Sequence, residues 1–178
     1  MRGLLFREFM AFAEERFGAD VASDLMPPGD AERAWNPVAA YSHEGLLDLA
    51  GRLGELTGSP RADLLQAYGA RLFHRLAALY PGFLVGARSA LPFIAGFQAA
   101  IHDEIQKLHP DSEVPQIRCT SRGADRLELV YRSPRRLGDL AEGLLRGCAD
   151  HFGERVAIDR VDVTEPTGQT VRFTLTRA

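Results

Sequence analysis

The sequence has little cysteine, no long apolar run and no excess of positive charge. Its two cysteines, Cys119 and Cys148, are too few for a disulfide framework or a four-thiolate zinc site, and they fit a protein of the reducing cytoplasm. No apolar stretch approaches the roughly 18 residues of a membrane span, and charged residues come too early for a signal peptide. The 21 basic residues are outnumbered by 24 acidic ones, which argues against nucleic-acid binding.

The rest of the composition is typical of a globular protein. The chain has 178 residues, of which 46% are hydrophobic and 25% charged, so it can bury a core without disulfides. Chains of this length usually form one compact domain, and no linker or repeat divides this one. We therefore expect a single domain over residues 1–178.

The apolar spacing changes along the chain. Apolar residues spaced three and four positions apart predict five helices. Two of them cover residues 4–17 and 19–25, and a third is capped by Ser42 and ends at Gly58. The fourth starts at Pro60 and ends before Pro81, and the fifth is a long helix over 90–109. Alternation in the last third predicts strands over 115–120, 125–131, 155–163 and 170–176, with a helix over 136–152. We expect an α+β fold, in which a helical N-terminal part packs on a C-terminal antiparallel sheet with an inserted helix.

His102 stands out among five histidines, none of which has a metal-ligand spacing such as HExxH. It falls at the edge of the apolar stripe of its predicted helix, beside Ala95 and Ala99. The two small residues leave a flat space that a large planar group could fill. The alternative is a half-buried histidine that is hydrogen-bonded to a carbonyl.

A second feature lies at the end of the second predicted strand. Tyr131, Ser133 and Arg135 are two residues apart, so they project to one side of an extended backbone. A phenol, a hydroxyl and a guanidinium that converge form a receptor for a carboxylate or a phosphate. The alternative is a turn in which Ser133 caps the next helix and the arginines are solvated.

The order and spacing of these features resemble the haem–nitric oxide/oxygen binding (H-NOX) family, which supplies the haem domain of soluble guanylate cyclase and bacterial gas sensors. The similarity covers essentially the whole chain. It rests on the opening Met1-Arg2-Gly3, the turn Tyr80-Pro81, the segment 101–108 around His102, Pro115, and the YxSxR signature at 131–135.

The resemblance implies a haem b, iron protoporphyrin IX, between the helical part and the sheet. His102 would be the axial ligand of the iron, and Tyr131, Ser133 and Arg135 would hold the haem propionates. The residues implied to pack on the macrocycle are Pro115, Leu5 and Leu144, and those implied in the distal gas pocket are Phe9, Leu72 and Leu140.

The sequence departs from the family pattern at one informative position. Members that hold oxygen stably use a distal tyrosine, and Leu140 stands at the matching position here. The cysteine-bound zinc of some members is also absent, since only two cysteines are present. The resemblance therefore implies a protein that binds nitric oxide and carbon monoxide rather than oxygen.

We expect a cytoplasmic, non-enzymatic haem sensor of nitric oxide, since no Ser-His-Asp order, GxSxG, P-loop or GxGxxG motif is present. Nitric oxide would weaken the bond between His102 and the iron and free the helix that carries it. No output segment follows Ala178, so the signal would pass to a separate protein such as a histidine kinase or a cyclic-dinucleotide enzyme. The alternatives are a haem-independent or thiol redox-sensing module of the same fold, and a small enzyme that uses His102 with Arg135.

Overall fold

The computed structural model describes residues 3–26, 35–36, 39, 41–97, 115–121, 123–165 and 168–178. Six α-helices and a four-stranded sheet lie in this part of the chain, and the predicted α+β fold is confirmed. The segment 98–114, which contains His102 and most of the predicted helix over 90–109, falls outside the described residues.

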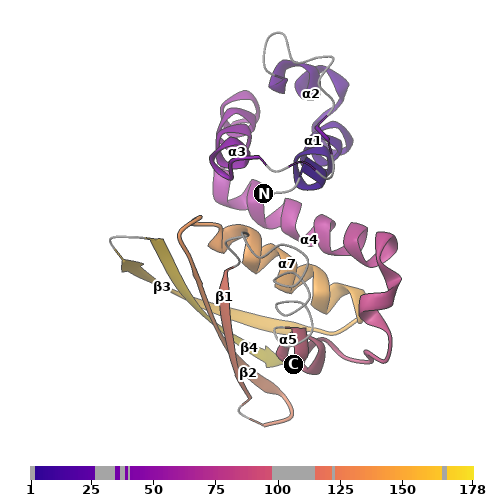
Figure 1. Cartoon of the computed structure of the whole chain (residues 1–178), viewed down its shortest axis with the longest axis vertical. Helices are drawn as coiled ribbons and strands as arrows, with labels where there is room; N and C mark the ends of the chain where they lie inside the picture. The colour runs from indigo at the N-terminus through magenta and orange to yellow at the C-terminus, as the bar shows by residue number, and fades with distance from the viewer. Residues whose placement is uncertain are drawn as a thin grey trace.

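One long helix, α4 (Arg61–Leu79), lies between two groups of elements (Figure 1). On one side are α1 (Gly3–Phe17), α2 (Ala19–Leu25) and α3 (Glu44–Thr57). On the other side are the short helix η1 (Pro81–Leu84), α5 (Ala90–Phe97), α7 (Gly138–His151) and the sheet.

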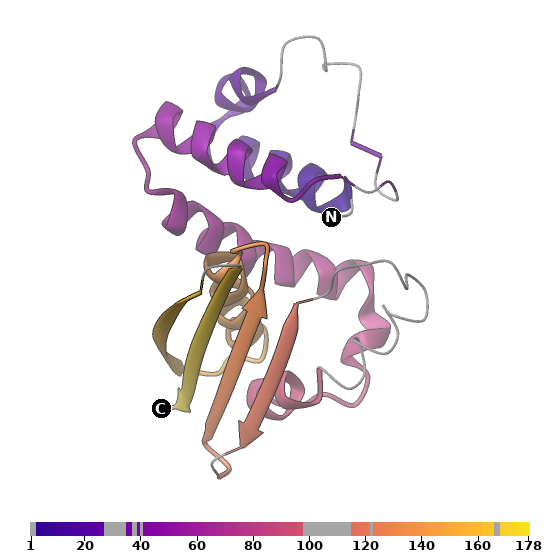
Figure 2. The same cartoon turned by 60° about the vertical axis from the view of Figure 1, so that its left-hand side comes forward.

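The sheet is antiparallel throughout, with the strand order β1 (Gln116–Ser121), β2 (Arg126–Ser133), β4 (Gly168–Arg177), β3 (Val156–Glu165). Helix α7 packs on one face of the sheet (Figure 2). On β2 and β4 every second side chain is buried on that face, as the alternating sequence predicts.

The buried side chains form two hydrophobic clusters. The first lies between α1, α3 and the N-terminal half of α4, and includes Phe6, Phe9, Tyr68 and Leu72. The second lies between the sheet, α5, α7 and the C-terminal end of α4. Leu144 of α7 packs against both clusters, so α4 and α7 together join the two halves of the core.

Helix ends follow the predicted signals with small shifts. Gly58 closes α3 in the left-handed region with φ 70°, a conformation that glycine adopts without strain. Pro60 has ψ 134°, so α4 begins one residue later than predicted and Pro60 is its N-cap. Ser42 accepts a hydrogen bond from the backbone N–H of Glu44 at 3.2 Å, although His43 is the residue that precedes α3.

Candidate functional site

Tyr131 and Ser133 lie on the buried face of β2, at the end of the strand that leads to α7. Their side chains are 5% and 2% exposed, whereas Arg132 between them points to the other face and is exposed. Arg135 is half-buried in the turn that follows. The predicted alternation along this segment therefore brings a phenol and a hydroxyl to one side of the strand, beside a guanidinium.

The turn from β2 to α7 is held by hydrogen bonds that start at Ser133. Its hydroxyl accepts the backbone N–H of Arg135 at 3.1 Å, so it fixes the turn rather than capping α7, which begins after Leu137. Gly138 donates its N–H to the side-chain oxygen of Gln169 at 2.9 Å, and a Cβ on Gly138 would lie 2.8 Å from Val171. Glycine is required at this close approach, which sets where α7 begins.

The surroundings of Tyr131 raise the pKa of its phenol above the ordinary value. Burial raises the pKa of the phenol, while a hydrogen bond with Ser133, the charge of Arg135 and the backbone of Leu137 oppose the rise. The phenol of Tyr131 is thus hydrogen-bonded to Ser133 and lies within the electrostatic influence of Arg135. Such a set of donors suits a carboxylate, since Arg135 supplies charge and the hydroxyls supply direction.

The remaining predicted site residues in the described part of the chain are apolar, and those from α1, α4 and α7 form a wall in the first hydrophobic cluster. Phe9, Leu72 and Leu140 are almost fully buried, in α1, α4 and α7. Leu5 of α1 and Leu144 of α7 pack against the same cluster but stay half-buried. Pro115, which directly precedes β1, is also half-buried. These partly covered apolar side chains suit a large hydrophobic ligand whose acidic groups reach Arg135.

Tyr68 of α4 is a buried phenol in contact with Phe9, and the sequence did not single it out as a site residue. Its hydroxyl donates to the carbonyl oxygen of Leu5 at 2.6 Å, and its ring meets Phe9 edge to face with centroids 5.1 Å apart. Burial raises the pKa of Tyr68 well above its ordinary value, so the proton stays on the oxygen. The helical spacing marked Tyr68 as a core residue, but the hydrogen bond depends on how α1 crosses α4.

Helices α4 and α7 approach each other closely through glycines. A Cβ on Gly69 would lie 2.5 Å from the carbonyl oxygen of Leu140, and a Cβ on Gly143 would collide with the carbonyl oxygen of Gln66. Gly147 packs in the same way against Ala70. This seam fixes Leu140 and Leu144 relative to Leu72.

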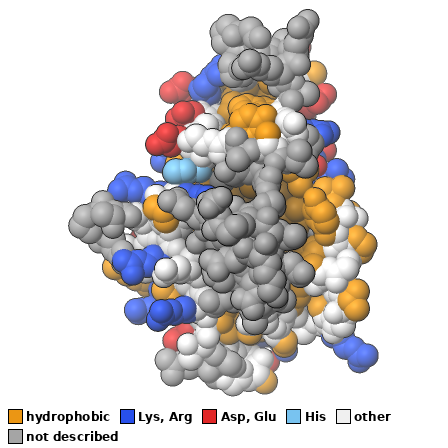
Figure 3. All heavy atoms as spheres, in the orientation of Figure 1, with side chains coloured by type: hydrophobic (Ala, Val, Ile, Leu, Met, Phe, Trp, Pro, Cys, Tyr) orange, Lys and Arg blue, Asp and Glu red, His pale blue; other side chains and the backbone are white. Residues whose placement is uncertain are grey.

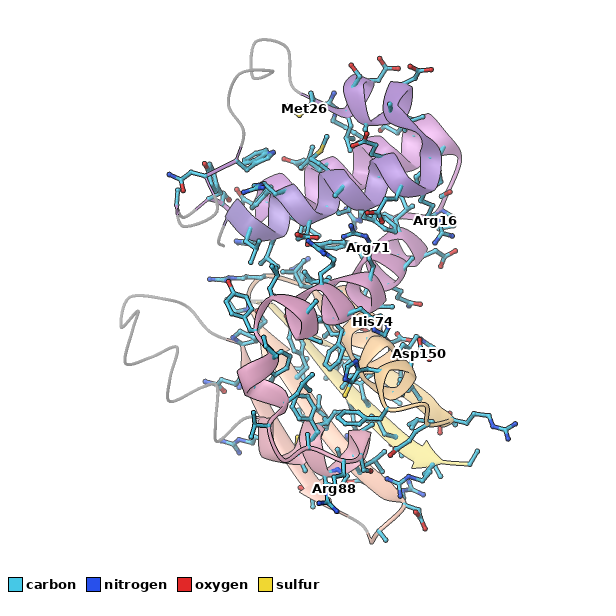
Figure 4. All side chains as sticks on the ribbon, turned by 90° about the vertical axis from the view of Figure 1, so that its right-hand side faces the viewer. Arg16, Met26, Arg71, His74, Arg88 and Asp150 are labelled. Carbon is cyan, nitrogen blue, oxygen red and sulfur yellow. The ribbon has the colours of Figure 1, made fainter. Side chains whose placement is uncertain are left out.

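An ion-pair network joins α1 to α4 beside the apolar wall. Glu8 is buried, and its carboxylate meets Arg71 at 2.9 Å and Arg75 at 3.0 Å. Arg71 extends from α4 toward α1 and also pairs with the exposed Glu15 at 2.6 Å (Figure 4). Burial alone would raise the pKa of Glu8, but hydrogen bonds from Arg75 and Arg71 outweigh it and lower the pKa.

A second network ties α7 to β3. Glu142 is 5% exposed and accepts hydrogen bonds from Gln66 at 3.1 Å, Arg146 at 2.6 Å and Arg160 at 3.1 Å. Arg160 also contacts Asp139 at 2.5 Å. The sequence indicates only the pair of Glu142 with Arg146, four residues later in α7, because Gln66 and Arg160 come from distant segments.

The described residues contain no group of three or more His, Cys, Asp or Glu side chains that could hold a metal ion. His74 and His151 are exposed, with ring centroids 6.1 Å apart, whereas His43 is half-buried. The candidate ligand His102 and its neighbour His109 fall outside the described residues, so the assignment of His102 stays a prediction.

The two cysteines are free and poorly suited to redox sensing. Cys119 is half-buried on β1, where its thiol contacts the carbonyl oxygen of Ile94 at 3.8 Å, and burial raises its pKa. Burial, helped by the charge of Glu154, raises the pKa of Cys148 to about 12. Neither thiol is activated as a nucleophile, which weakens the thiol-sensing alternative.

No helix in the described part of the chain is long and apolar enough to cross a bilayer.

The sequence and the fold were then compared with those of known proteins. The family model for haem-NO-binding proteins (HNOB) matches residues 2–160. A search of curated proteins found no match.

Solved H-NOX structures share the fold over nearly their whole length. The unliganded Fe(II) H-NOX protein from K. algicida is 25% identical, with 100% of this chain and 97% of that chain covered and a TM-score of 0.88. The S. oneidensis H-NOX protein in the Fe(II)NO ligation state is 24% identical, covering 100% and 99%, with a TM-score of 0.87. A T. tengcongensis H-NOX mutant has 16% identity, coverage of 99% and 97%, and a TM-score of 0.87.

Proposed function

Because the HNOB model spans most of its length, the chain belongs to the haem-NO-binding family of gas-sensing haem domains, and we propose that it senses nitric oxide through a bound haem b and signals to a separate protein. The proposal is supported by Tyr131 and Ser133 on the buried face of β2, with Arg135 in the turn that follows, and by apolar side chains of the predicted site that stay partly covered. A haem has this combination of a large apolar ring and acidic side groups.

The residues present fit a haem. In this proposal the propionates meet Arg135, with Tyr131 and Ser133 supplying further hydrogen bonds. Leu5, Leu144 and Pro115 cover the ring, and burial of their remaining apolar surface contributes to haem retention at about 25 cal/mol per Å². His102 holds the iron through its imidazole, an assignment that rests on the sequence resemblance.

The haem supplies a ferrous iron that binds diatomic gases, and the protein decides which gas is held. Phe9, Leu72 and Leu140 form the distal wall in this proposal, and none of them donates a hydrogen bond. The hydroxyl of Tyr68 behind them is already used by the carbonyl of Leu5. A wall without a free donor favours nitric oxide and carbon monoxide over oxygen, which depends most on such a bond.

The signal is proposed to leave the site through its helices. His102 would hold the iron, and a weakened bond between them would release the segment around His102, which the sequence predicts to be helical. The wall itself is held by the α4–α7 seam and by the Glu8 network between α1 and α4. A ligand that favours one of two packings of these elements shifts their equilibrium.

The proposed partner is a separate signalling protein such as a histidine kinase or a cyclic-dinucleotide enzyme, and we propose no catalytic activity for this chain. The proposed cytoplasmic location rests on cysteine usage, since both cysteines are free.

The visible spectrum of the reduced protein, with and without nitric oxide, tests the proposal. We expect a Soret band that shifts with nitric oxide, and loss of haem in His102→Ala with partial recovery on addition of imidazole. His74→Ala is the matched control, because His74 is exposed on α4, and it should leave the spectrum unchanged. A well-folded protein that binds no haem when haem is supplied would contradict the proposal.

A further inference from the structure

Among the described strands, β3 pairs with a neighbour on one side only. It lies at the end of the strand order β1-β2-β4-β3, and both ribbon views draw it at the margin of the sheet (Figure 1, Figure 2). It is ten residues long, and within the described residues no strand pairs with its outer side. It also contains neither proline nor lysine, residues that commonly protect an edge strand from pairing with another chain.

The hydrogen bonds of the sheet identify which backbone groups face this free edge. Ala178 donates its N–H to the carbonyl oxygen of Arg155 at 2.9 Å, one step beyond the pair Val156↔Arg177. Hydrogen-bonded pairs alternate in an antiparallel ladder, so the odd-numbered residues of β3 bond to β4. The even-numbered residues therefore direct their N–H and C=O groups to the free edge: Ile158, Arg160, Asp162 and Thr164.

The outer face of β3 carries the charged residue Asp159 beside the apolar residues Ala157, Val161 and Val163. Val161 is 57% exposed and Val163 is 41% exposed. They lie on the sheet face opposite Arg160, whose guanidinium reaches Asp139 and Glu142 of α7. Single exposed valines are common, but here they flank a free backbone ladder.

We propose that β3 pairs with β3 of a second copy of this chain, antiparallel, about a two-fold axis at Val161. In this register the even-numbered backbone groups of each copy meet those of the other, as a hydrogen-bonded ladder requires. Arg160 lies opposite the partner's Asp162, and Asp162 opposite the partner's Arg160. Val161 contacts the partner's Val161 on the outer face, and the two sheets become one of eight strands.

Charge selects this register over its neighbours. Moving the two-fold axis by one residue places either Arg160 opposite the partner's Arg160 or Asp162 opposite the partner's Asp162. Like charges directly opposite each other destabilise a strand pair. Within one chain Arg160 and Asp162 already pair at 2.6 Å, so the register about Val161 extends an existing ion pair into an alternating group of four charges.

The proposed interface is small, so the affinity between the two copies is expected to be low. A ladder of about seven residues from each copy buries less than the roughly 1,200 Å² of a standard interface, so the dimer is expected to be weak and dependent on concentration. Arg160 also holds α7 through Asp139 and Glu142. The interface would therefore share this guanidinium with the helix that carries Leu140 and Leu144.

Sedimentation velocity of the full chain from about 1 to about 300 µM, the range of weak association, tests the inference. We expect the wild-type protein to shift from monomer to dimer over this range. Val161→Asp and Val161→Lys should each weaken association roughly tenfold or more, because two like charges then meet at the axis. An equimolar mixture of the two variants should dimerise again, since the charges become opposite.

Val85→Asp is the matched control. Val85 is 84% exposed and directly follows η1, which lies outside the sheet. In the shared orientation of Figures 1 and 3, the end of α4 and orange side chains lie on the right, whereas β3 lies at the left-hand margin. The association of Val85→Asp should equal that of the wild-type protein, and circular dichroism confirms that each variant is folded. A wild-type monomer throughout, a dimer that survives both substitutions, or folded Lys and Asp variants that stay monomeric when mixed would each overturn the inference. The measurement reads mass, so its failure is distinct from a failure to bind haem.

Discussion

Arg135 differs from its neighbour Arg136 in its surroundings, although both are arginines in one turn. Arg135 is half-buried beside Tyr131 and Ser133, whereas Arg136 is exposed and has φ 51°. Comparing substitutions at the two positions therefore distinguishes the effect of a guanidinium held beside Tyr131 and Ser133 from the effect of one positive charge in the same turn.

We expect Arg135→Ala to lose haem faster than Arg136→Ala. A charge-assisted hydrogen bond in a partly buried site contributes about 1.5–3 kcal/mol, or roughly 10- to 150-fold in affinity. Haem transfer to an excess of an apo-globin gives the two rates. Equal rates would remove Arg135 from the propionate site.

Leu140 decides gas selectivity in the proposed pocket. With no free donor in the distal wall, the ferrous protein should bind nitric oxide and carbon monoxide but form no stable oxygen complex in air. Leu140→Tyr should strengthen oxygen binding roughly 5- to 150-fold, the effect of a hydrogen bond of about 1–3 kcal/mol. The spectrum of the ferrous protein in air measures this. A stable oxygen complex of the unmutated protein would mean that another group, with Tyr68 the first candidate, donates.

Glu8 gives stability a dependence on pH. Its pKa is lowered in the folded protein, so its contribution is present above the unfolded pKa, near 4.5, and is lost as the pH falls through the folded pKa. Glu8→Gln should destabilise the protein at pH 7 by about 1–3 kcal/mol and flatten the acid limb below pH 4.5.

Urea unfolding between pH 3 and pH 7 measures the effect of Glu8→Gln. The matched control is Glu15→Gln, which removes the exposed partner of Arg71 and should change stability little. Similar losses in both variants would show that the buried position of Glu8 is not what matters.

At the scale of elements, the α4–α7 seam depends on the absence of side chains. We expect Gly143→Ala to destabilise the fold by about 1–3 kcal/mol, because the added methyl meets the backbone of Gln66. Gly51→Ala in α3 should instead stabilise it by about 0.4–1 kcal/mol, since nothing lies within 4 Å of the added methyl. Urea denaturation of the two variants compares them, and a stabilising Gly143→Ala would mean that the helices can separate at low cost.

The local sequence pattern predicted where helices and strands lie better than it predicted which side chains of different elements contact each other. Turn glycines and apolar periodicity predicted most helices and strands to within two residues, because both act within a few positions along the chain. The same periodicity offers no reason to bury Glu142 of α7. Glu142 is buried because Gln66 and Arg160, from α4 and β3, reach it.

At the scale of the whole molecule, α4 and α7 connect a helical half to a sheet half. Leu144 contacts both hydrophobic clusters, and the Glu8 and Glu142 networks lie on either side of the α4–α7 seam. A shift of one half relative to the other must therefore pass through these few contacts. The free edge of β3 lies outside both clusters, so association there need not disturb the core.

The sequence by itself determined the α+β fold, the family resemblance and the placing of Tyr131 and Ser133 on one face of β2, because alternation along a strand is a local property of the backbone. Only the tertiary structure decided that Tyr68 donates to Leu5, that Glu8 is buried between two arginines, and that glycines bring α4 against α7. Each of these contacts joins residues more than sixty positions apart. The packing of whole elements creates such contacts, and no local pattern encodes them.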